Sequence, residues 1–236
     1  NHYQRQLEVL LDAIPSRQFA LAGGRASDAA ALDREIARAF DALRAAQPQE
    51  GHDLQFTADG LAKRKRSHLL PDRVYSKWQS LAARPKPDAA ATDDLIADVR
   101  GMIAHAGDTS NLILDPDLDS YYLMDITLLA LPQMQDRLAV ILRDALKGTA
   151  GSNDTAEARQ QLGVALALLK ESDLARIAAD TETALNEDAN FHGVSESLQK
   201  ELPAAKQHCA EAVTAFVTVL ERPVAASPQE ILNAGL

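Results

Sequence analysis

The chain has 236 residues, enough for one large or two small domains, and only 4% of them are aromatic. Abundant alanine and leucine, with few aromatic and β-branched residues, argue against β-sheet and for an all-α fold. The formal net charge of −10 and a pI near 5.0 disfavour binding to nucleic acid or adsorption to an anionic membrane.

The first expected helical region extends to about residue 46. Apolar residues recur there at helical spacing, Pro15 is expected to kink the helix, and Gly23 and Gly24 are expected to loosen it. The segment QPQEGHD, residues 47–53, ends this region and forms a connection.

Residues 54–83 form a weaker helical region, in which Pro71 suits a first turn and divides the region into two short helices. The basic run Lys63–Arg66 is expected to be a solvated helix face, because four residues do not reverse the field of an acidic chain. After the break RPKPD at 84–88, a third helix carries one apolar side, formed by Leu95, Val99, Met102, Ile103 and Ala106.

The fourth helix is expected to begin within SNLILDPDLDSYYLMD, residues 110–125, and to run to about Leu146. Pro132 lies in its interior and would kink it. The segment KGTAGSND, residues 147–154, separates this helix from a fifth, which ends at NEDANFHG, residues 186–193.

The sixth helix carries a coiled-coil-like seam with alternating spacings of four and three. The seam consists of Leu198, Leu202, Ala205, Cys209, Ala212, Phe216 and Leu220. Cys209, the single cysteine, is therefore predicted to be buried and unreactive, and no intramolecular disulfide is possible. A last helix is predicted from Ser227 as N-cap, Pro228 at the first helical position and Glu230 at the third.

Long helices with short polar connections predict an elongated antiparallel helical bundle, with residues 1–236 as a single all-helical domain. Two stacked four-helix bundles that share long helices are one arrangement of this kind. The first residue is not methionine, and both ends lie within helical patterns, so the sequence is expected to be a fragment of a longer protein. No stretch approaches the roughly 18 apolar residues of a membrane-spanning helix.

The segment at 110–125 places several carboxylates beside a tyrosine pair. Asp115 suits a helix N-cap, Pro116 the first helical position, and Asp117 the positive end of the helix dipole. The start of a helix is therefore enough to explain these three residues, without a role in function.

Asp125 differs, because it falls in the middle of an apolar face formed by Leu118, Tyr121, Tyr122, Leu128, Leu129 and Pro132. A carboxylate there needs a partner: a tyrosine hydroxyl, a basic residue on another helix, a water or a ligand. An internal hydrogen bond between helices and a ligand contact are the two alternatives. The two tyrosines likewise pack in the core or line a pocket for a small polar ligand.

Motifs for catalysis are absent from the sequence. It has no Glu-x-x-His metal pair, no histidines four residues apart, no Gly-rich phosphate loop and no nucleophile elbow. We therefore expect no enzymatic activity in this fragment, no cofactor and no metal. The candidate ligand-binding residues are Asp125, Tyr121, Tyr122, Asp119 and Asn111.

At GDTSNLILDPDLDSYYLMD, residues 107–125, the sequence resembles the all-helical extracytoplasmic sensor regions of bacterial transmembrane receptors. These receptors include methyl-accepting chemotaxis proteins and sensor histidine kinases. The resemblance is strong over residues 107–132 and weaker over LIADVRGMIAH, residues 95–105, and ERPVAASPQEILNAG, residues 221–235. The motif itself does not identify a ligand.

The resemblance implies the periplasmic part of an inner-membrane protein, held between two membrane helices and coupled to a cytoplasmic chemotaxis or histidine kinase module. It implies a small polar ligand or a periplasmic binding protein as partner, and a homodimer is compatible with it. The alternative is a helical adaptor bundle that mediates protein–protein interaction and has no small-molecule site.

Overall fold

The computed structural model describes residues 2–84, 86, 88–110, 117–149, 156–190, 193–222 and 226–235. All regular secondary structure in these ranges is helical, which confirms the predicted all-α fold. The chain divides into two compact units, residues 1–113 (unit 1) and residues 114–236 (unit 2). Each described helix lies within one unit, so the shared long helices that the sequence suggested are not found among them. Across the described ranges, no helix has both the length and the apolar character needed to cross a membrane.

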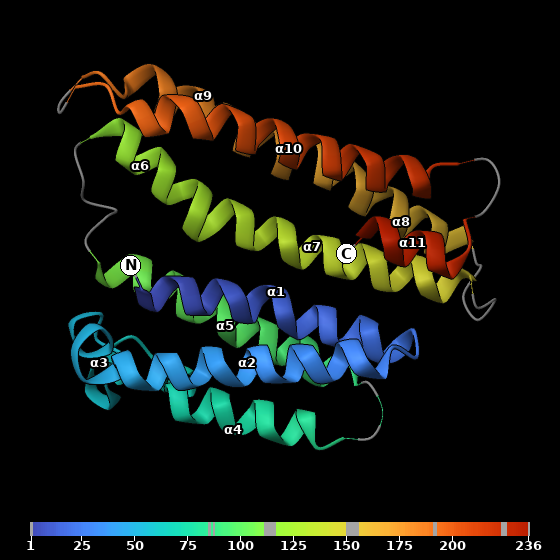
Figure 1. Cartoon of the computed structure of the whole chain (residues 1–236), viewed down its shortest axis with the longest axis horizontal. Helices are drawn as coiled ribbons and strands as arrows, with labels where there is room; N and C mark the ends of the chain where they lie inside the picture. Colours follow the sequence, from blue (N-terminus) through green and yellow to red (C-terminus); the bar gives the residue numbers. More distant parts are fainter. Residues whose placement is uncertain are drawn as a thin grey trace. The chain divides into compact units, whose positions relative to one another are not determined.

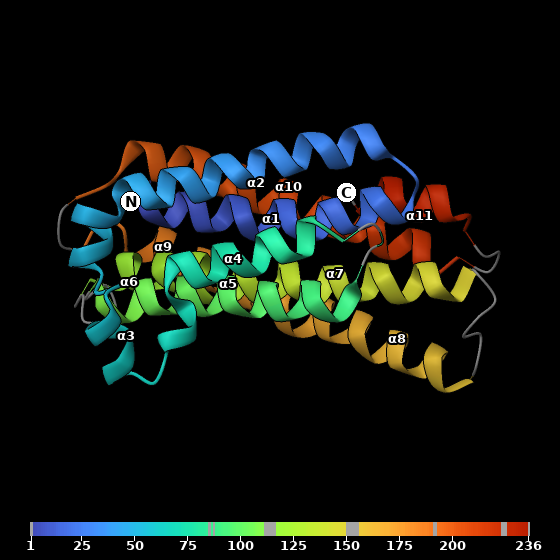
Figure 2. The same cartoon turned by 90° about the horizontal axis from the view of Figure 1, so that it is seen from below.

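Unit 1 is an up-and-down bundle of four main helices, shown in blue to green in Figures 1 and 2. Helix α1 packs against α2 and α5, α2 packs against α4, and α4 packs against α5, which closes the ring. The helices are α1 (His2–Ala22), α2 (Ala26–Ala46), α4 (Pro71–Ala82) and α5 (Ala89–Thr109). A short helix, α3 (Ala58–Lys63), and a 3₁₀ turn, η2 (Ser67–Leu69), lie between α2 and α4.

The core of unit 1 follows the apolar stripes of the sequence. Its buried side chains include Leu7, Leu10, Ile14, Ile36, Phe40, Leu43, Val74, Trp78, Leu95, Val99 and Met102. Because each helix contributes residues at helical spacing, burying these stripes against one another stabilises the bundle.

The first helical region is two helices rather than one loosened helix. Gly24 has a φ of +71°, a left-handed conformation that glycine adopts without steric cost, and the chain reverses there between α1 and α2. Pro15 lies inside α1, which continues through it without interruption. The connection expected at residues 47–53 begins as a wide π-type turn, η1 (Gln47–Gly51), directly after α2.

The region before the third predicted helix does divide into short helices, and Pro71 occupies the first helical position of α4. The basic run was expected on one helix face, but only Lys63 lies in a helix. Arg64 follows as the C-cap of α3, and Lys65 has a φ of +57°, which ends helical geometry.

Unit 2 contains two long interrupted helices, a single long helix and a short one, shown in green to red in Figure 1. Helix α6 packs against α9, α7 against α8 and α11, and α10 against α9 and α11. The first long helix comprises α6 (Leu118–Asp125), a π-type turn η4 (Ile126–Ala130) and α7 (Leu131–Thr149). The second comprises α8 (Ala156–Leu168), a π-type turn η5 (Leu169–Leu174) and α9 (Ala175–Glu187), and it is followed by α10 (Glu196–Leu220) and α11 (Pro228–Gly235).

The start of α11 agrees with the prediction from the sequence. The backbone N–H of Ser227 donates to Glu230 Oε2 at 2.9 Å, and the backbone N–H of Glu230 donates to Ser227 Oγ at 3.3 Å. This reciprocal pair is a capping box, and Pro228 occupies the first position of the helix.

The predicted seam of α10 is only partly correct. Phe216 is buried, but Ala205 and Ala212 are exposed, and the other buried residues of α10 are Val213 and Val217. Cys209 is half-buried rather than buried. Helix α10 packs against α9 and α11, and Ala205 and Ala212 lie on the part of α10 that these contacts leave in solvent.

Candidate functional site

Helix α6 begins at Leu118 with Asp117 as its N-cap residue, two positions later than the start predicted with Asp115 as cap. Asp115, Pro116 and the candidate ligand residue Asn111 lie outside the described residues. Asp119 lies in the first turn, where its side chain accepts a hydrogen bond from the backbone N–H of Ser120. Asp119 therefore has a local structural partner.

Asp125 is buried, as predicted, with 7% of its surface exposed. The apolar face that was expected around it is incorrect in part, because Leu118, Tyr121 and Leu129 are exposed by 45%, 37% and 42%. The wide turn at Ile126–Ala130 changes the phase of the helix, so Leu129 does not share the face of Asp125 that a uniform helical spacing predicts. Leu118 and Tyr121 precede the turn, which therefore does not account for their exposure.

Asp125 has a basic partner on another helix, which is one of the four alternatives considered for it. Arg176 of α9 donates from Nε to Asp125 Oδ2 at 2.9 Å and from Nη2 to Asp125 Oδ1 at 2.6 Å. Such paired, charge-assisted hydrogen bonds have a fixed geometry. They raise the pKa of the Arg176 guanidinium, with the hydrogen bonds to Asp125 as the largest cause.

Asp180, one turn further along α9, is a second carboxylate at the same guanidinium. Its Oδ2 lies 3.8 Å from Arg176 Nε, too far for a good hydrogen bond, and this buried oxygen has no hydrogen-bond donor among the residues that the structure describes. The pKa of Asp180 is raised to about 6, mainly by burial and then by the neighbouring carboxylate of Asp125, against the opposing effect of Arg176.

A similar charged contact joins the same two long helices further along. Asp173, in the π-type turn η5, is 2% exposed, accepts a hydrogen bond from Gln133 Nε2 at 3.0 Å and pairs with Arg137 of α7. We call Asp125, Arg137, Asp173, Arg176 and Asp180 the charged ladder. Its three carboxylates exceed its two guanidinium groups by one, and Asp180 is the carboxylate without a close cationic partner.

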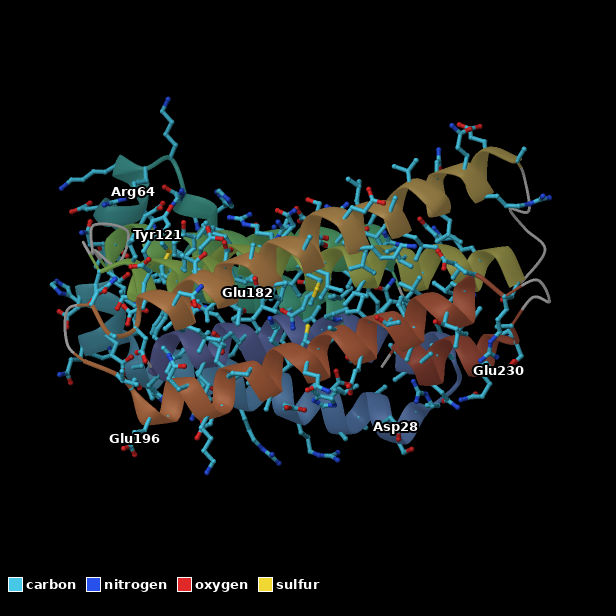
Figure 3. The ribbon with its side chains drawn as sticks, turned by 90° about the horizontal axis from the view of Figure 1, so that it is seen from above. Asp28, Arg64, Tyr121, Glu182, Glu196 and Glu230 are labelled. Carbon is cyan, nitrogen blue, oxygen red and sulfur yellow. The ribbon has the colours of Figure 1, made fainter. Side chains whose placement is uncertain are left out.

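The two tyrosines lie at the solvent edge of this ladder. Their rings meet edge to face with centroids 5.4 Å apart, and Tyr121 is near enough to Arg176 to interact with its charge. Tyr121 is 37% exposed and Tyr122 is half-buried, so neither is a fully buried core aromatic. Figure 3 shows Tyr121 at the end of unit 2 opposite Glu230.

The sequence reasoning missed Arg176 and Asp180. The signal was present, because Asp173, Arg176 and Asp180 recur at spacings of three and four beside the buried Ile177. A charged line at helical spacing along an apolar stripe indicates ion pairs across a helix interface.

Four hollows in the described part of the chain lie away from Asp125. Two are in unit 1, between α4 and α5 (about 540 Å³) and between α2 and α4 (about 590 Å³). Two are in unit 2, of about 390 Å³ and 250 Å³, beside α7 and α8. Access to the ladder is instead from the surface, since the Arg176 side chain is 42% exposed. The described residues contain no group of three or more potential metal ligands.

Comparison with known proteins adds no family assignment. Neither the models of protein families, nor the curated proteins, nor the solved structures include a match to this chain. The charged ladder and the sequence motif that contains Asp125 are therefore the features of this chain that point to a function.

Proposed function

We propose that this chain is the extracytoplasmic sensor domain of a bacterial transmembrane receptor, of the chemoreceptor or sensor histidine kinase kind. It would form the periplasmic portion of an inner-membrane protein and relay ligand binding as a displacement of helices. Support comes from the resemblance over residues 107–132 and from the position of that motif at the start of α6, where it contributes Asp125 to the charged ladder.

The observation that carries this proposal is the buried Oδ2 of Asp180, which has no hydrogen-bond donor in the described part of the chain. A buried oxygen without a donor is costly, whereas a donor from outside the chain removes that cost. The complementary ligand is a small molecule with a protonated amine or another strong hydrogen-bond donor. Tyr121 at the solvent edge offers an aromatic surface for the rest of such a ligand.

Ligand binding at this point has a direct route to helix movement. Arg176 holds α6 through Asp125 and faces Asp180 of its own helix. A cation at Asp180 repels the guanidinium and compensates both carboxylates, so the ligand favours a different contact between α6 and α9. A ligand shifts a conformational equilibrium only through such a difference in affinity, and displacements of one to two ångströms are typical of signalling helices.

The complete reading frame tests the membrane part of the proposal. The proposal predicts that the reading frame encodes apolar segments of about 20 residues before and after this sequence. A reading frame without such segments would rule out a receptor held between two membrane helices.

A thermal-shift screen of amines, amino acids and organic acids tests the sensing part, since a ligand that binds the native state raises the melting temperature. We expect amine-containing compounds to stabilise the wild-type chain and not the Asp180→Asn variant. Asp173→Asn is the matched control, because it alters another buried aspartate at the same helix pair and leaves Asp125 and Arg176 intact. Equal stabilisation of all three proteins would exclude the ladder end at Asp180 as the binding site.

A helical adaptor is the second candidate, and the exposed apolar side chains of unit 2 favour it. Leu129, Val164 and Leu168 are 42%, 54% and 42% exposed, and exposed apolar surface marks a protein interaction site where it is contiguous. This candidate predicts no response to any small molecule in the screen and a stable complex with another protein or a second copy of the chain.

A further inference from the structure

Residues 55–66 form a small unit around α3, which lies in Figures 1 and 2 at the same end of unit 1 as the N-terminus. Arg64, labelled in Figure 3, donates from Nη1 to Gln55 Oε1 at 2.8 Å, and the backbone N–H of Arg66 donates to the carbonyl of Leu61 at 2.8 Å. These bonds join the two ends of the segment to each other. We call residues 55–66 the α3 flap.

The backbone of the α3 flap is strained near both ends. Gln55 has a φ of +55° and Lys65 a φ of +57°, and within the described ranges these are the two non-glycine residues with a positive φ. A left-handed conformation is unfavourable for a residue with a β-carbon and persists only where the surrounding structure holds it. The flap therefore depends on contacts with the rest of unit 1.

His105 of α5 supplies a buried contact of this kind. Its side chain is fully buried, its Nε2 lies 3.3 Å from the carbonyl oxygen of Gln55, and its ring meets Phe56 edge to face with centroids 4.6 Å apart. A carbonyl oxygen only accepts, so Nε2 carries the hydrogen and donates it. The imidazole thus binds α5 directly to one of the two left-handed residues.

The other ring nitrogen, Nδ1, is the atom that takes up a proton in this tautomer. It is buried and has no hydrogen-bond partner in the described part of the chain. A proton there would create a charged N–H group without an acceptor, which is costly in a buried position. The docked flap therefore requires a neutral His105.

The charges around the ring act in the same direction. Burial lowers the pKa of His105, against the hydrogen bond to Gln55, and the positive charges of Arg66 and Arg64 lower it further. Asp108, the carboxylate beside them on α5, is already paired with Arg66 at 2.5 Å. The docked state thus disfavours the imidazolium through both burial and charge.

The elements that pack against α5 provide no acceptor for Nδ1 in the described ranges. On α1, the Tyr3 hydroxyl donates to Gln47 Oε1 at 2.9 Å, and burial raises its pKa, so it stays neutral. Glu50 of η1 accepts from the backbone N–H of Tyr3. The other titratable residues at this end, on η2 and at the start of α4, are exposed: His68, Asp72 and Arg73.

We propose that the α3 flap is an acid-sensitive element that is released from α5 when His105 is protonated at Nδ1. Release places the imidazolium in water and lets the two left-handed residues relax. Phe56 and Leu61 are fully buried and oppose release, so the released form is a minor population that grows as pH falls. This inference does not depend on the sensor proposal.

The direction of the pH effect follows from the two states. His105 has an ordinary pKa of 6.5 when released and a lower pKa when docked, so release takes up a proton below pH 6.5. Docking is therefore strongest above pH 6.5 and weakens as pH falls through that value.

Native-state amide hydrogen exchange, corrected for its intrinsic dependence on pH, tests the proposal between about pH 8 and pH 5. The protection of flap amides such as Leu61 and Arg66 is expected to fall by up to about tenfold per pH unit below 6.5, the limit for one proton. His105→Gln removes the titrating group and should abolish this slope. His68→Gln, the same change at an exposed histidine of η2, is the matched control and should keep it.

A slope confined to the flap, present in the wild type and the control and absent from His105→Gln, supports the proposal. A slope that persists in His105→Gln, or an equal loss of protection along α2, overturns it. Should His105→Gln fail to fold, nuclear magnetic resonance of the imidazole in the wild type decides. A neutral ring with hydrogen on Nε2 that titrates below pH 6.5 supports the proposal, and hydrogen on Nδ1 or titration at 6.5 or above overturns it.

Discussion

Replacement of Arg176 by methionine is the most informative change at the charged ladder. Methionine retains much of the aliphatic volume of arginine and removes the charge, so Asp125 and Asp180 remain as neighbouring carboxylates without a cation. Their side chains are 11% and 13% exposed, which leaves little water to compensate them. The variant isolates the electrostatic contribution of the guanidinium from its packing.

The expected loss of stability follows from the exposure of the arginine. Removing one partner of a fully buried ion pair costs about 3–5 kcal/mol. The Arg176 side chain is 42% exposed, so water reaches this pair from one side and reduces the loss. We expect the free energy of unfolding to fall by about 2–3 kcal/mol at neutral pH.

The loss should depend on pH with a definite sign. The pKa of Asp180 in the folded chain, about 6, lies above its ordinary value of 3.8, so its contribution to stability is present at low pH and lost as pH rises through 6. Arg176 opposes this rise in pKa, so the removal of Arg176 raises the pKa of Asp180 further. The variant should therefore be more impaired at about pH 8 than at about pH 5.

Urea unfolding of the wild type and the variant at the two pH values measures both quantities. The variant Arg176→Met/Asp180→Asn is the control, because it removes the second carboxylate and should recover part of the loss. A loss below about 0.5 kcal/mol, the usual range for surface substitutions, with no dependence on pH would show that the ladder contributes nothing to the folded state.

Three further predictions concern residues outside the ladder. Burial lowers the pKa of His105 below 6.5, so the folded chain should lose stability as pH falls below 6.5, and His105→Gln should abolish that slope in urea unfolding. Cys209 is half-buried and burial raises the pKa of its thiol, so a thiol reagent should label it more slowly in the native chain than in the unfolded chain; equal rates would contradict the contact with its neighbours. Ser227→Ala removes the capping box of α11 and should destabilise that helix by about 1 kcal/mol, visible as faster amide hydrogen exchange; unchanged exchange would show that the cap is not formed in solution.

The sequence predicted helix starts correctly where each start depends on a few residues that are close together in the chain. Pro71 at a first helical turn and the Ser227–Glu230 box are local interactions, and both helix starts are found where the sequence indicates them. The reversal at Gly24 was underestimated, because an apolar stripe that continues through a glycine does not reveal whether the chain bends or turns back.

Only one member of the candidate site, Asp125, could be predicted from the sequence, and its partners could not. An isolated acid in an apolar stripe identified Asp125 as buried, but its partner depends on which helix packs against α6, and a periodic pattern does not contain that information. The wide turn after Asp125 also escaped prediction, and it contains Leu129, which lies in solvent rather than in the core. Arg176 and Asp180 therefore became visible only once α6 and α9 were adjacent.

The central claim is that a ligand with a hydrogen-bond donor binds the carboxylate of Asp180. Calorimetric titration of the amine that gives the largest thermal shift, at about pH 6 in two buffers with different ionisation enthalpies, tests it most directly, because the heat reports protons released on binding. Near its pKa of about 6 the Asp180 carboxyl is partly protonated, so binding to the wild type should release a fraction of a proton. The Asp180→Asn variant should bind at least tenfold more weakly and release none. Binding of equal strength in both proteins, with no proton released from either, would contradict the account.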